Sequence, residues 1–343
     1  MPIPHISPAR IPIFEPPRDP DDLRVKHLII PYGEPRSGKE DALGLIGVGS
    51  DLGVTNGGGR EGARLGPEAI RGELRRYGAA YDFESEADLS TLSIIDVGDL
   101  NVDPDSIEVT HRRLSEAVEA MLAERIFPIV LGGGHDLTFA GVRGLAKASQ
   151  EALGGIAIDA HFDVREAREG QISSGTPFRR ILEELSVPGE RFVEIGANGC
   201  VNARIHFDYL MGKKARIFSL SETREKGMRE VFAKALQTIA HQTQGIFVSF
   251  DLDSVAQAFA PGVSAPSPEG LTPREITDAA YLAGLEPKLR YLDIMELNPN
   301  FDQDNRTARL AVAILHAFFS GRVRRNALQA RERIGFRPAG DLH

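Results

Sequence analysis

The sequence predicts an α/β fold in which a mostly parallel sheet is covered by helices on both faces. Short apolar runs alternate with amphipathic stretches along the chain, as expected for strands joined by helical crossovers. Several apolar runs end in Asp or His, a composition typical of buried parallel strands that carry polar groups at their carboxyl ends. The 343 residues, 42% of them hydrophobic, are enough for one large domain of this kind.

The predicted elements begin after a proline-rich and charged arm over residues 1–40, which we expect to be extended or irregular. A first strand is predicted at 43–50, before a glycine-rich loop at 56–64 and a helix that starts at Gly66 with Pro67 in its first turn. Further strands, each a short apolar run, are predicted at 92–97, 126–131, 156–163, 191–196, 215–218, 245–250 and 289–294. Helices are predicted at 106–122, 136–148, 176–185, 200–211, 220–241, 273–284 and 304–320.

The chain is therefore divided into the arm (1–40), one domain (41–322) and a C-terminal tail (323–343). Six arginines lie between Arg322 and Arg337, and we interpret this segment as a solvated or subunit-facing helix. Lys and Arg number 40 against 49 Asp and Glu, which gives a formal net charge of −9. This balance argues against general nucleic-acid binding, which requires a basic face.

The compartment can be predicted from the cysteine content and from the apolar runs. Cys200 is the only cysteine, so no intrachain disulfide can form, which fits a reducing cytoplasm. Prolines interrupt the N-terminal region, and the longest late apolar run, at 310–319, is too short to cross a bilayer. We therefore expect a soluble cytoplasmic protein without a membrane partner.

The stretch from Ile156 to Asp163 carries three metal-competent side chains at its end. Asp159, His161 and Asp163 occupy alternate positions, so on a strand they would share one face. The carboxyl end of a parallel strand is also where open α/β sheets bind their ligands. A polar strand end that caps nearby helices would give the same pattern, so this motif alone leaves metal binding open.

Two more apolar runs end in groups of the same kind. One is followed by Asp251 and Asp253, and the other by three glycines and His135. We interpret the next residue, Asp136, as the N-cap of the helix that follows. The three strand ends together offer two imidazoles and four carboxylates, which are too many ligands for one structural zinc and suit two divalent ions. The oxygen-rich set favours Mn²⁺.

Four motifs resemble those of the ureohydrolases, the family of arginases, agmatinases and formimidoylglutamases. They are GGGHD at 132–136, DAHFD at 159–163, SFDLD at 249–253 and DIMELNP at 293–299. The resemblance extends over residues 44–320 and implies a three-layer α/β/α, arginase-like fold with a mostly parallel eight-stranded sheet. It also implies two Mn²⁺ ions per subunit and assembly into a homo-oligomer, a trimer or a hexamer.

By position in these motifs, the resemblance implies six metal ligands. One ion would be held by His135, Asp159, Asp163 and Asp251. The other would be held by Asp159, His161, Asp251 and Asp253. Asp159 and Asp251 would then bridge the two ions.

The chemistry expected at such a centre is hydrolysis of a carbon–nitrogen bond in a small cationic amidine or guanidine. Two divalent ions lower the pKa of water toward neutrality and so supply the strong nucleophile that a resonance-stabilised carbon requires. The resemblance assigns Glu296 to the cationic group of the substrate, which a carboxylate would hold by charge-assisted hydrogen bonds. Asp163 is the ligand best placed to pass a proton to the leaving amine. These two residues are the predicted catalytic pair.

The loop after the DAHFD motif separates the branches of the family. Arginases and agmatinases carry a His-Gly pair there, whereas this chain has Ser174 in the run 173–178, which resembles formimidoylglutamases. Segments 50–67 and 261–266 resemble the same branch. The expected reaction is therefore hydrolysis of N-formimidoyl-L-glutamate to L-glutamate and formamide, with Ser174 in the substrate site and no histidine proton shuttle.

This substrate carries two carboxylates, which favour cationic donors at the mouth of the site. Arg60, Arg165, Arg168 and Arg179 lie in or near the loops expected to surround the centre. We choose Arg60 as the substrate-binding arginine because its glycine-rich surroundings allow a ligand to approach closely. Each of these arginines could instead form an ordinary surface ion pair.

Three alternatives remain open at this stage. An agmatinase-like or guanidino-acid amidinohydrolase would release urea. A non-catalytic member would keep the fold for assembly, although all six ligands and Glu296 are present. A zinc deacetylase of related fold would need fewer ligands, so His135 and Asp253 argue against it.

Overall fold

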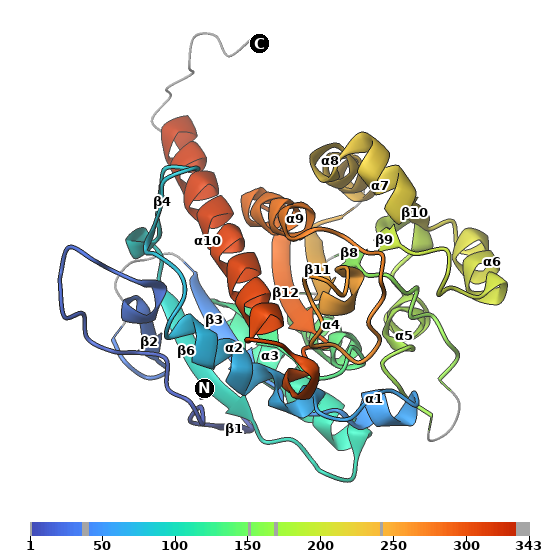
Figure 1. Ribbon diagram of the computed structural model, residues 1–343, viewed down its shortest axis with the longest axis horizontal. Helices are drawn as coiled ribbons and strands as arrows, with labels where there is room; N and C mark the ends of the chain where they lie inside the picture. The colour runs from blue at the N-terminus through green and yellow to red at the C-terminus, as the bar shows by residue number, and fades with distance from the viewer. Residues whose placement is uncertain (1, 36–40, 150–151, 168–170, 241–242, 334–343) are drawn as a thin grey trace.

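The computed structural model describes residues 2–35, 41–149, 152–167, 171–240 and 243–333 (Figure 1). Its centre is a ten-stranded sheet in the spatial order β1-β6-β3-β7-β12-β11-β8-β9-β10, with β2 also paired to β6. Apart from β1 and β2, the strands of this sheet come from the body of the chain and are parallel to one another. They are β3 (Ala42–Gly47), β6 (Ile94–Leu100), β7 (Ile126–Leu131), β8 (Leu153–Ile158), β9 (Phe192–Ala197), β10 (Arg216–Ser219), β11 (Gly245–Asp251) and β12 (Leu289–Met295).

The arm adds two short strands at one edge of this sheet. β1 (Ile6–Ser7) runs antiparallel to β6, and β2 (Ile29–Pro31) runs parallel to it. The arm thereby pairs with backbone groups that would otherwise form an open sheet edge. The predicted eight-stranded parallel sheet is confirmed for the body, and the described part of the arm, expected to be extended or irregular, contains the two short strands β1 and β2. Residues 36–40 of the arm lie outside the described residues.

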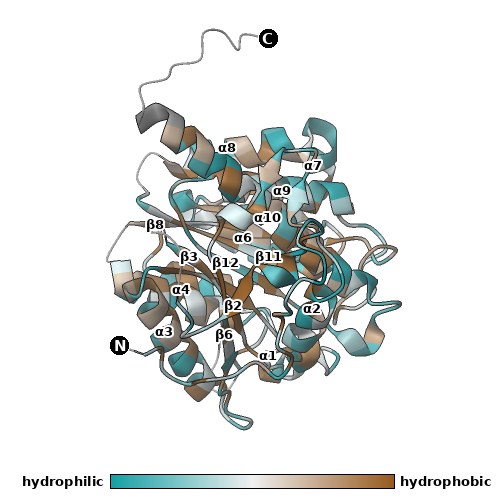
Figure 2. Cartoon of the chain, turned by 90° about the vertical axis from the view of Figure 1, so that its left-hand side faces the viewer, coloured by the Kyte–Doolittle hydropathy of each residue, from teal (hydrophilic) through white to brown (hydrophobic). Residues whose placement is uncertain are grey.

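Helices cover both faces of the sheet, so the predicted three-layer α/β/α fold is confirmed. Figure 2 shows the apolar strands between helices of the two outer layers, and each face buries its own hydrophobic cluster. One face packs against α2 (Gly66–Leu74), α7 (Leu220–Lys226), α8 (Met228–Ala240), α9 (Pro273–Leu285) and α10 (Arg306–Arg333). The other packs against α3 (Ile107–Ala123), α4 (Leu137–Ser149), α5 (Pro177–Glu184) and α6 (Arg204–Gly212).

Three smaller elements, one helix and two strands, lie outside these layers. Helix α1 (Leu52–Asn56) follows β3 directly and was not predicted from the sequence. Strands β4 (Tyr81–Asp82) and β5 (Ala87–Asp88) form a separate antiparallel hairpin between α2 and β6. Because α1 follows the carboxyl end of β3, it brings the glycine-rich loop back over that edge of the sheet.

The prediction of one helix over 220–241 is wrong, because the chain forms two helices there. Gly227 separates α7 from α8 and adopts a φ of +83°, a left-handed conformation that ends a helix without strain only at glycine. The sequence contained this glycine, but an isolated glycine does not always end a helix.

The prediction that the last helix ends near residue 320 is also wrong, because α10 continues to Arg333. Gly321 lies at the contact with α9, where an added Cβ would come within 2.1 Å of the Tyr281 carbonyl oxygen. This glycine therefore serves the close approach of two helices and does not end one. The boundary predicted at 322 lies inside α10, and residues 334–343 of the tail are outside the described residues.

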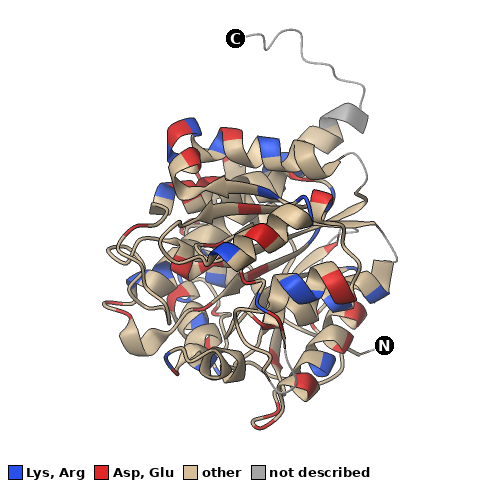
Figure 3. Ribbon diagram, turned by 90° about the vertical axis from the view of Figure 1, so that its right-hand side faces the viewer, with Lys and Arg blue, Asp and Glu red and all other residues tan. Residues whose placement is uncertain are grey.

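The outer surface carries charges of both signs. Figure 3 shows basic and acidic residues interspersed over one side of the molecule. Some charged residues pair one helical turn apart, as Arg204 does with Asp208 at 3.3 Å. Exposed pairs of this type stabilise a helix by only about 0.3–0.5 kcal/mol each. Among the described residues, the helices include none that is both long and apolar enough to cross a membrane.

Candidate metal centre

The carboxyl ends of four adjacent strands meet at one place on the sheet edge. Strands β7, β12, β11 and β8 are neighbours in that order, and polar residues follow or end each of them. The structure brings all six predicted ligands together there, in two groups whose ligand atoms lie within 4.8 Å of one another. The groups are His135, Asp159, Asp163 and Asp251, and Asp159, His161 and Asp253.

In the first group, one imidazole nitrogen faces three carboxylates. His135 Nδ1 lies 3.0 Å from Asp163 Oδ2, 3.0 Å from Asp251 Oδ2 and 3.2 Å from Asp159 Oδ2. His135, Asp159 and Asp251 are buried, and Asp163 is nearly so. One nitrogen cannot donate to three carboxylates at once, so a cation would suit this arrangement better than a proton does.

The second group shares Asp159 with the first. His161 Nδ1 lies 3.3 Å from Asp253 Oδ1 and 3.6 Å from Asp159 Oδ1. Asp251 belongs to the first group only, and its Oδ1 accepts a hydrogen bond from the Asp253 backbone N–H at 2.7 Å. Its role as a second bridge between two ions stays a prediction. The geometry thus joins the two groups through Asp159.

The interpretation of residues 159, 161 and 163 as alternate positions of one strand is wrong, because β8 ends at Ile158. Asp159 Oδ1 instead accepts a hydrogen bond from the His161 N–H at 2.7 Å, which turns the chain. Asp163 then adopts a φ of +45°, a left-handed conformation. The three side chains still converge on one centre, but the turn and not strand alternation brings them together.

The donor set fits divalent cations. Asp159 Oδ2 and Asp253 Oδ1 are buried and have no hydrogen-bond partner among the described residues, although imidazole nitrogens lie close by. Buried carboxylate oxygens without a partner destabilise a fold unless something compensates their charge. Carboxylates mixed with imidazoles are the ligands expected for Mn²⁺ or a similar ion.

The pKa values of the ligands show how strongly the cluster needs positive charge. Burial, followed by the charge of Asp159, raises the pKa of Asp163 to about 6. Burial and the charges of Asp253 and Asp159 raise the pKa of Asp251 well above its ordinary value. Burial alone would lower the pKa of His135, but the three carboxylates that face its Nδ1 raise it well above its ordinary value. Without cations, the cluster therefore retains protons.

A chain of hydrogen bonds behind His135 fixes its orientation. His135 Nε2 lies 2.9 Å from Ser249 Oγ, which donates to Asp293 Oδ1 at 2.6 Å, and Thr138 Oγ1 donates to Asp293 Oδ2 at 2.8 Å. A proton on Nε2 leaves the lone pair of Nδ1 directed at the cluster. Sequence reasoning missed these supports, although Ser249 lies two positions before Asp251 and pairs in register with Asp293.

The prediction that Asp136 caps the next helix is wrong. Its Oδ2 lies 2.7 Å from His111 Nε2, and both side chains are buried. The first N–H groups of α4 instead donate to backbone carbonyls, since Leu137 donates to Gly134 and Thr138 to His135. A cap is therefore not needed, and Asp136 is held by a buried histidine from α3.

Glu296 and Ser174, both predicted for the substrate site, lie together beside His135. Ser174 Oγ donates to Glu296 Oε1 at 2.7 Å, and the His135 backbone N–H donates to the same oxygen at 2.8 Å. Glu296 is only 3% exposed and has a φ of +68°. Burial raises its pKa to about 8. A buried carboxyl of this kind favours a cationic ligand, which would let it ionise.

Arg60 lies at the rim, but its donors are engaged within the protein. Its Nε donates to the Ser264 carbonyl at 3.1 Å and its Nη2 to the Val263 carbonyl at 2.5 Å, while the guanidinium lies 3.7 Å from the centre of the Phe301 ring. These contacts tie the glycine-rich loop to the segment 261–266. Contact between Arg60 and the substrate stays a prediction. What the structure shows is that Arg60 holds the glycine-rich loop against the segment 261–266.

Glu194, on β9, is a buried acid that sequence reasoning missed. It pairs in register with Ala157, and neither of its carboxylate oxygens has a hydrogen-bond partner among the described residues. Burial, followed by the charges of Asp159 and Asp163, raises its pKa well above the ordinary value. The available signal was a lone glutamate within an otherwise apolar strand.

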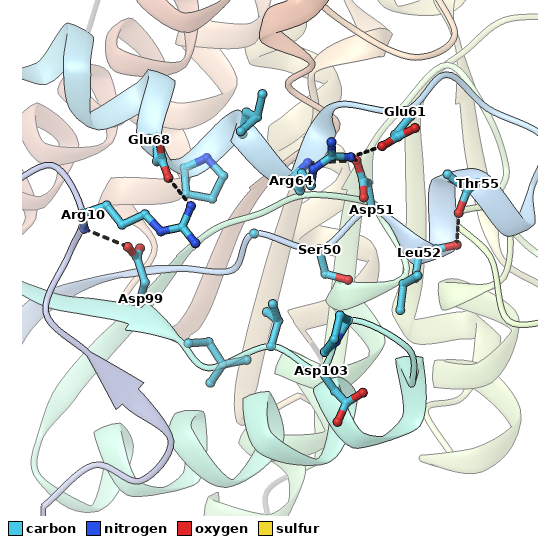
Figure 4. A pocket seen from close by; sticks show the side chains of 16 residues that line it. Arg10, Ser50, Asp51, Leu52, Thr55, Glu61, Arg64, Glu68, Asp99 and Asp103 are labelled. Carbon is cyan, nitrogen blue, oxygen red and sulfur yellow. Dashed lines mark hydrogen bonds and ion pairs between the residues drawn. The ribbon is translucent and has the colours of Figure 1, made fainter.

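A pocket of about 500 Å³ lies at the ends of β3 and β6, but none of the six ligands lines it. Most of its charged groups pair with one another, since Arg64 pairs with Asp51 and Glu61, and Arg10 pairs with Glu68 (Figure 4). The chemistry therefore belongs to the ligand cluster and not to this pocket.

Comparison with known proteins identifies the family of the chain. The model of the arginase family matches residues 41–320. The formimidoylglutamase of Rhodococcus jostii is 34% identical over 285 residues, which cover 81% of this chain and 85% of that protein. The crystal structure of Trypanosoma cruzi formiminoglutamase with Mn²⁺ has a TM-score of 0.82 at 35% identity and covers 89% of this chain and 100% of that one. Proclavaminate amidino hydrolase from Streptomyces clavuligerus has a TM-score of 0.76 at 28% identity, covering 86% and 95% of the two chains. This chain belongs to the arginase family.

Proposed function

We propose that the protein hydrolyses N-formimidoyl-L-glutamate to L-glutamate and formamide. The observation that carries this proposal is the buried carboxyl of Glu296 directly beside the six-ligand cluster. A site that binds a cation next to a hydrolytic centre is suited to an amidinium. The choice of formimidoylglutamate is supported by the named activities of the relatives from Rhodococcus jostii and Trypanosoma cruzi.

We propose two Mn²⁺ ions per subunit, held by the six ligands of the cluster. Support comes from the two groups of ligand atoms, from the partnerless oxygens of Asp159 and Asp253, and from the Mn²⁺ in the related crystal structure. When bound, such ions supply a water molecule of lowered pKa that can attack an sp² carbon at neutral pH.

The chain's own residues would bind the substrate and move its protons. Glu296, held in place by Ser174 and by the His135 N–H, would bind the amidinium and align its carbon. Water adds to that carbon, and the bond to the glutamate nitrogen then breaks. Asp163, which lies beside His135 at the edge of the cluster, can carry the proton that the departing amine needs. The products are formamide and free glutamate.

Assays of the Mn²⁺-loaded protein against formimidoylglutamate, agmatine, arginine and guanidinobutyrate test this function. We expect glutamate and formamide from the first compound and little turnover of the others. Urea release, with a clear preference for a guanidino compound, would replace the proposal with an amidinohydrolase of the same family.

We further propose a cytoplasmic homo-oligomer, either a trimer or a hexamer, that acts on a small molecule without a nucleic-acid or membrane partner. Exposed apolar side chains support subunit contacts, because Ile205 on α6 is 73% exposed and Phe83 in the β4–β5 hairpin is 78% exposed. Sedimentation equilibrium of the purified protein would give the subunit number, and a monomer at all concentrations would contradict this proposal.

A further inference from the structure

Arg165 stands at the rim of the metal centre with no ion pair to any residue that the structure describes. Its backbone N–H donates to the Gly175 carbonyl at 2.8 Å, and its side chain passes over the same glycine. A Cβ at Gly175 would lie only 2.9 Å from Arg165 Cδ and 3.1 Å from its Nε. The base of the side chain is thus fixed, while the exposed guanidinium keeps its donors for another molecule.

The position of Arg165 connects it to both halves of the site. It follows Asp163 by two residues, and Gly175 follows Ser174, whose hydroxyl donates to Glu296. Two residues of extended chain span at most about 7 Å. A substrate whose amidinium meets Glu296 would therefore extend toward the Arg165 guanidinium.

The other arginines of the rim are already engaged. Arg60 donates to two carbonyl groups and lies against Phe301. Arg179 pairs with Glu183 at 3.3 Å and lies 4.6 Å from the centre of the Tyr209 ring. Arg168, the fourth arginine that the sequence suggested, is outside the described residues.

His206 on α6 lies within the field of two rim arginines. His206 on α6 has its pKa lowered first by burial and then by the positive charges of Arg165 and Arg179. The positive charge of Arg165 and its unused hydrogen-bond donors would both favour an anion that enters here.

We propose that Arg165 binds a carboxylate of the substrate and so selects an acidic amidine over guanidino compounds that lack a carboxylate. This inference rests on the proposed function, since formimidoylglutamate provides two carboxylates for such a contact. The planar guanidinium can hold a carboxylate through two parallel hydrogen bonds, which a lysine cannot do. Arg165 is therefore a specificity residue, whereas Arg60 holds the glycine-rich loop against the segment 261–266.

The test compares R165M and R165K with the unaltered Mn²⁺-loaded protein. For R165M we expect the KM for formimidoylglutamate to rise roughly 10–100-fold, with a much smaller change in kcat, because the contact is made in both ground and transition states. R165K should recover part of the loss. L-glutamate binding, measured by calorimetry, should weaken in parallel. R204M removes a highly exposed arginine of nearby α6 and serves as the matched control, with no change in KM expected.

Two analogues identify which carboxylate is bound. N-formimidoyl-γ-aminobutyrate lacks the α-carboxylate, and N-formimidoyl-L-norvaline lacks the side-chain carboxylate. R165M and the unaltered protein should have equal kcat/KM on the analogue that lacks the carboxylate contacted by Arg165, and unequal values on the other. An unchanged KM in R165M, or an equal loss on both analogues, overturns the inference while the hydrolase assignment stands. If the unaltered protein fails to hydrolyse formimidoylglutamate, the proposed function falls and takes this inference with it.

Discussion

The ligand cluster and the rim around it are held in place by different parts of the fold. The ligands lie at the carboxyl ends of the three strands β7, β8 and β11, and His135 and Asp159 are completely buried. The rim residues lie on loops that are fixed by contacts across the chain, such as the Ser174 N–H to the Gly53 carbonyl at 3.0 Å. The sheet therefore positions the metal ligands, whereas the loops position the residues that would select the substrate. Changes in the cluster should abolish the reaction, and changes at the rim should alter substrate binding.

The substitution D251N should have the largest effect and tests whether the cluster is a unit. Asp251 contacts His135 and accepts a hydrogen bond from the Asp253 N–H, so the neutral amide removes a charge from the first group and alters the support of Asp253 in the second. We expect loss of at least one Mn²⁺ and a fall in kcat of roughly a thousandfold or more, since metal activation supplies several kcal/mol. Metal content by mass spectrometry and kcat measure the two effects. D208N on the surface of α6 is the control, and full metal content with normal kcat in D251N would contradict this view.

The substitution E296Q changes a residue that contacts both the cluster, through His135, and the rim, through Ser174. It keeps the shape of the side chain but removes the charge that would hold the amidinium. We expect kcat/KM to fall roughly 10–100-fold, the value of a charge-assisted hydrogen bond, while Mn²⁺ content stays unchanged. The exposed pair residue Glu230 offers a matched control in E230Q. A loss of metal in E296Q would show instead that Glu296 belongs to the cluster.

The same division explains what the sequence could predict. Each ligand lies at or just beyond the end of an apolar run that is visible in the sequence. The meeting of the six ligands at one edge of the sheet could therefore be predicted, even though the predicted end of β8 was wrong. The rim depends on contacts that sequence periodicity does not reveal. Arg60 was chosen for its glycine-rich setting, but the carbonyls that engage it lie 203 and 204 positions away. Asp136 was wrongly predicted to be a helix cap because its actual partner, His111, lies on another helix and could not be identified from the sequence.

Removal of the Ser174 hydroxyl should have a smaller effect that is confined to the rim. In S174A, Glu296 Oε1 loses one of two hydrogen bonds but keeps the one from the His135 N–H. A neutral hydrogen bond contributes about 1 kcal/mol, so we expect a roughly three- to tenfold fall in kcat/KM. Steady-state kinetics beside S90A, a surface control, would measure it. An effect as large as that of E296Q would mean that Ser174 contacts the substrate directly.

The smallest effect concerns the stability of the metal-free protein. Burial raises the pKa of Glu296 from an ordinary 4.5 to about 8, and burial with the charge of Asp159 raises that of Asp163 from 3.8 to about 6. A carboxyl whose folded-state pKa is raised stabilises the fold below its unfolded pKa, and this contribution is lost as pH rises through the folded value. The pKa of Asp159 is lowered, so Asp159 acts in the opposite sense, but only at more acidic pH.

The chelated protein should therefore lose thermal stability between about pH 5 and pH 8, and E296Q should flatten the alkaline part of that loss. Saturating Mn²⁺ should reverse the trend, because cations stabilise the ionised carboxylates of the folded state and bind more tightly as protons leave them. Tm values of both proteins at several pH values, with chelator and with Mn²⁺, measure the two slopes. If E296Q keeps the full pH slope of the parent, Glu296 is not the group that titrates between about pH 5 and pH 8. Glu296 would then be ionised throughout this range and would count as one of the charged carboxylates of the cluster.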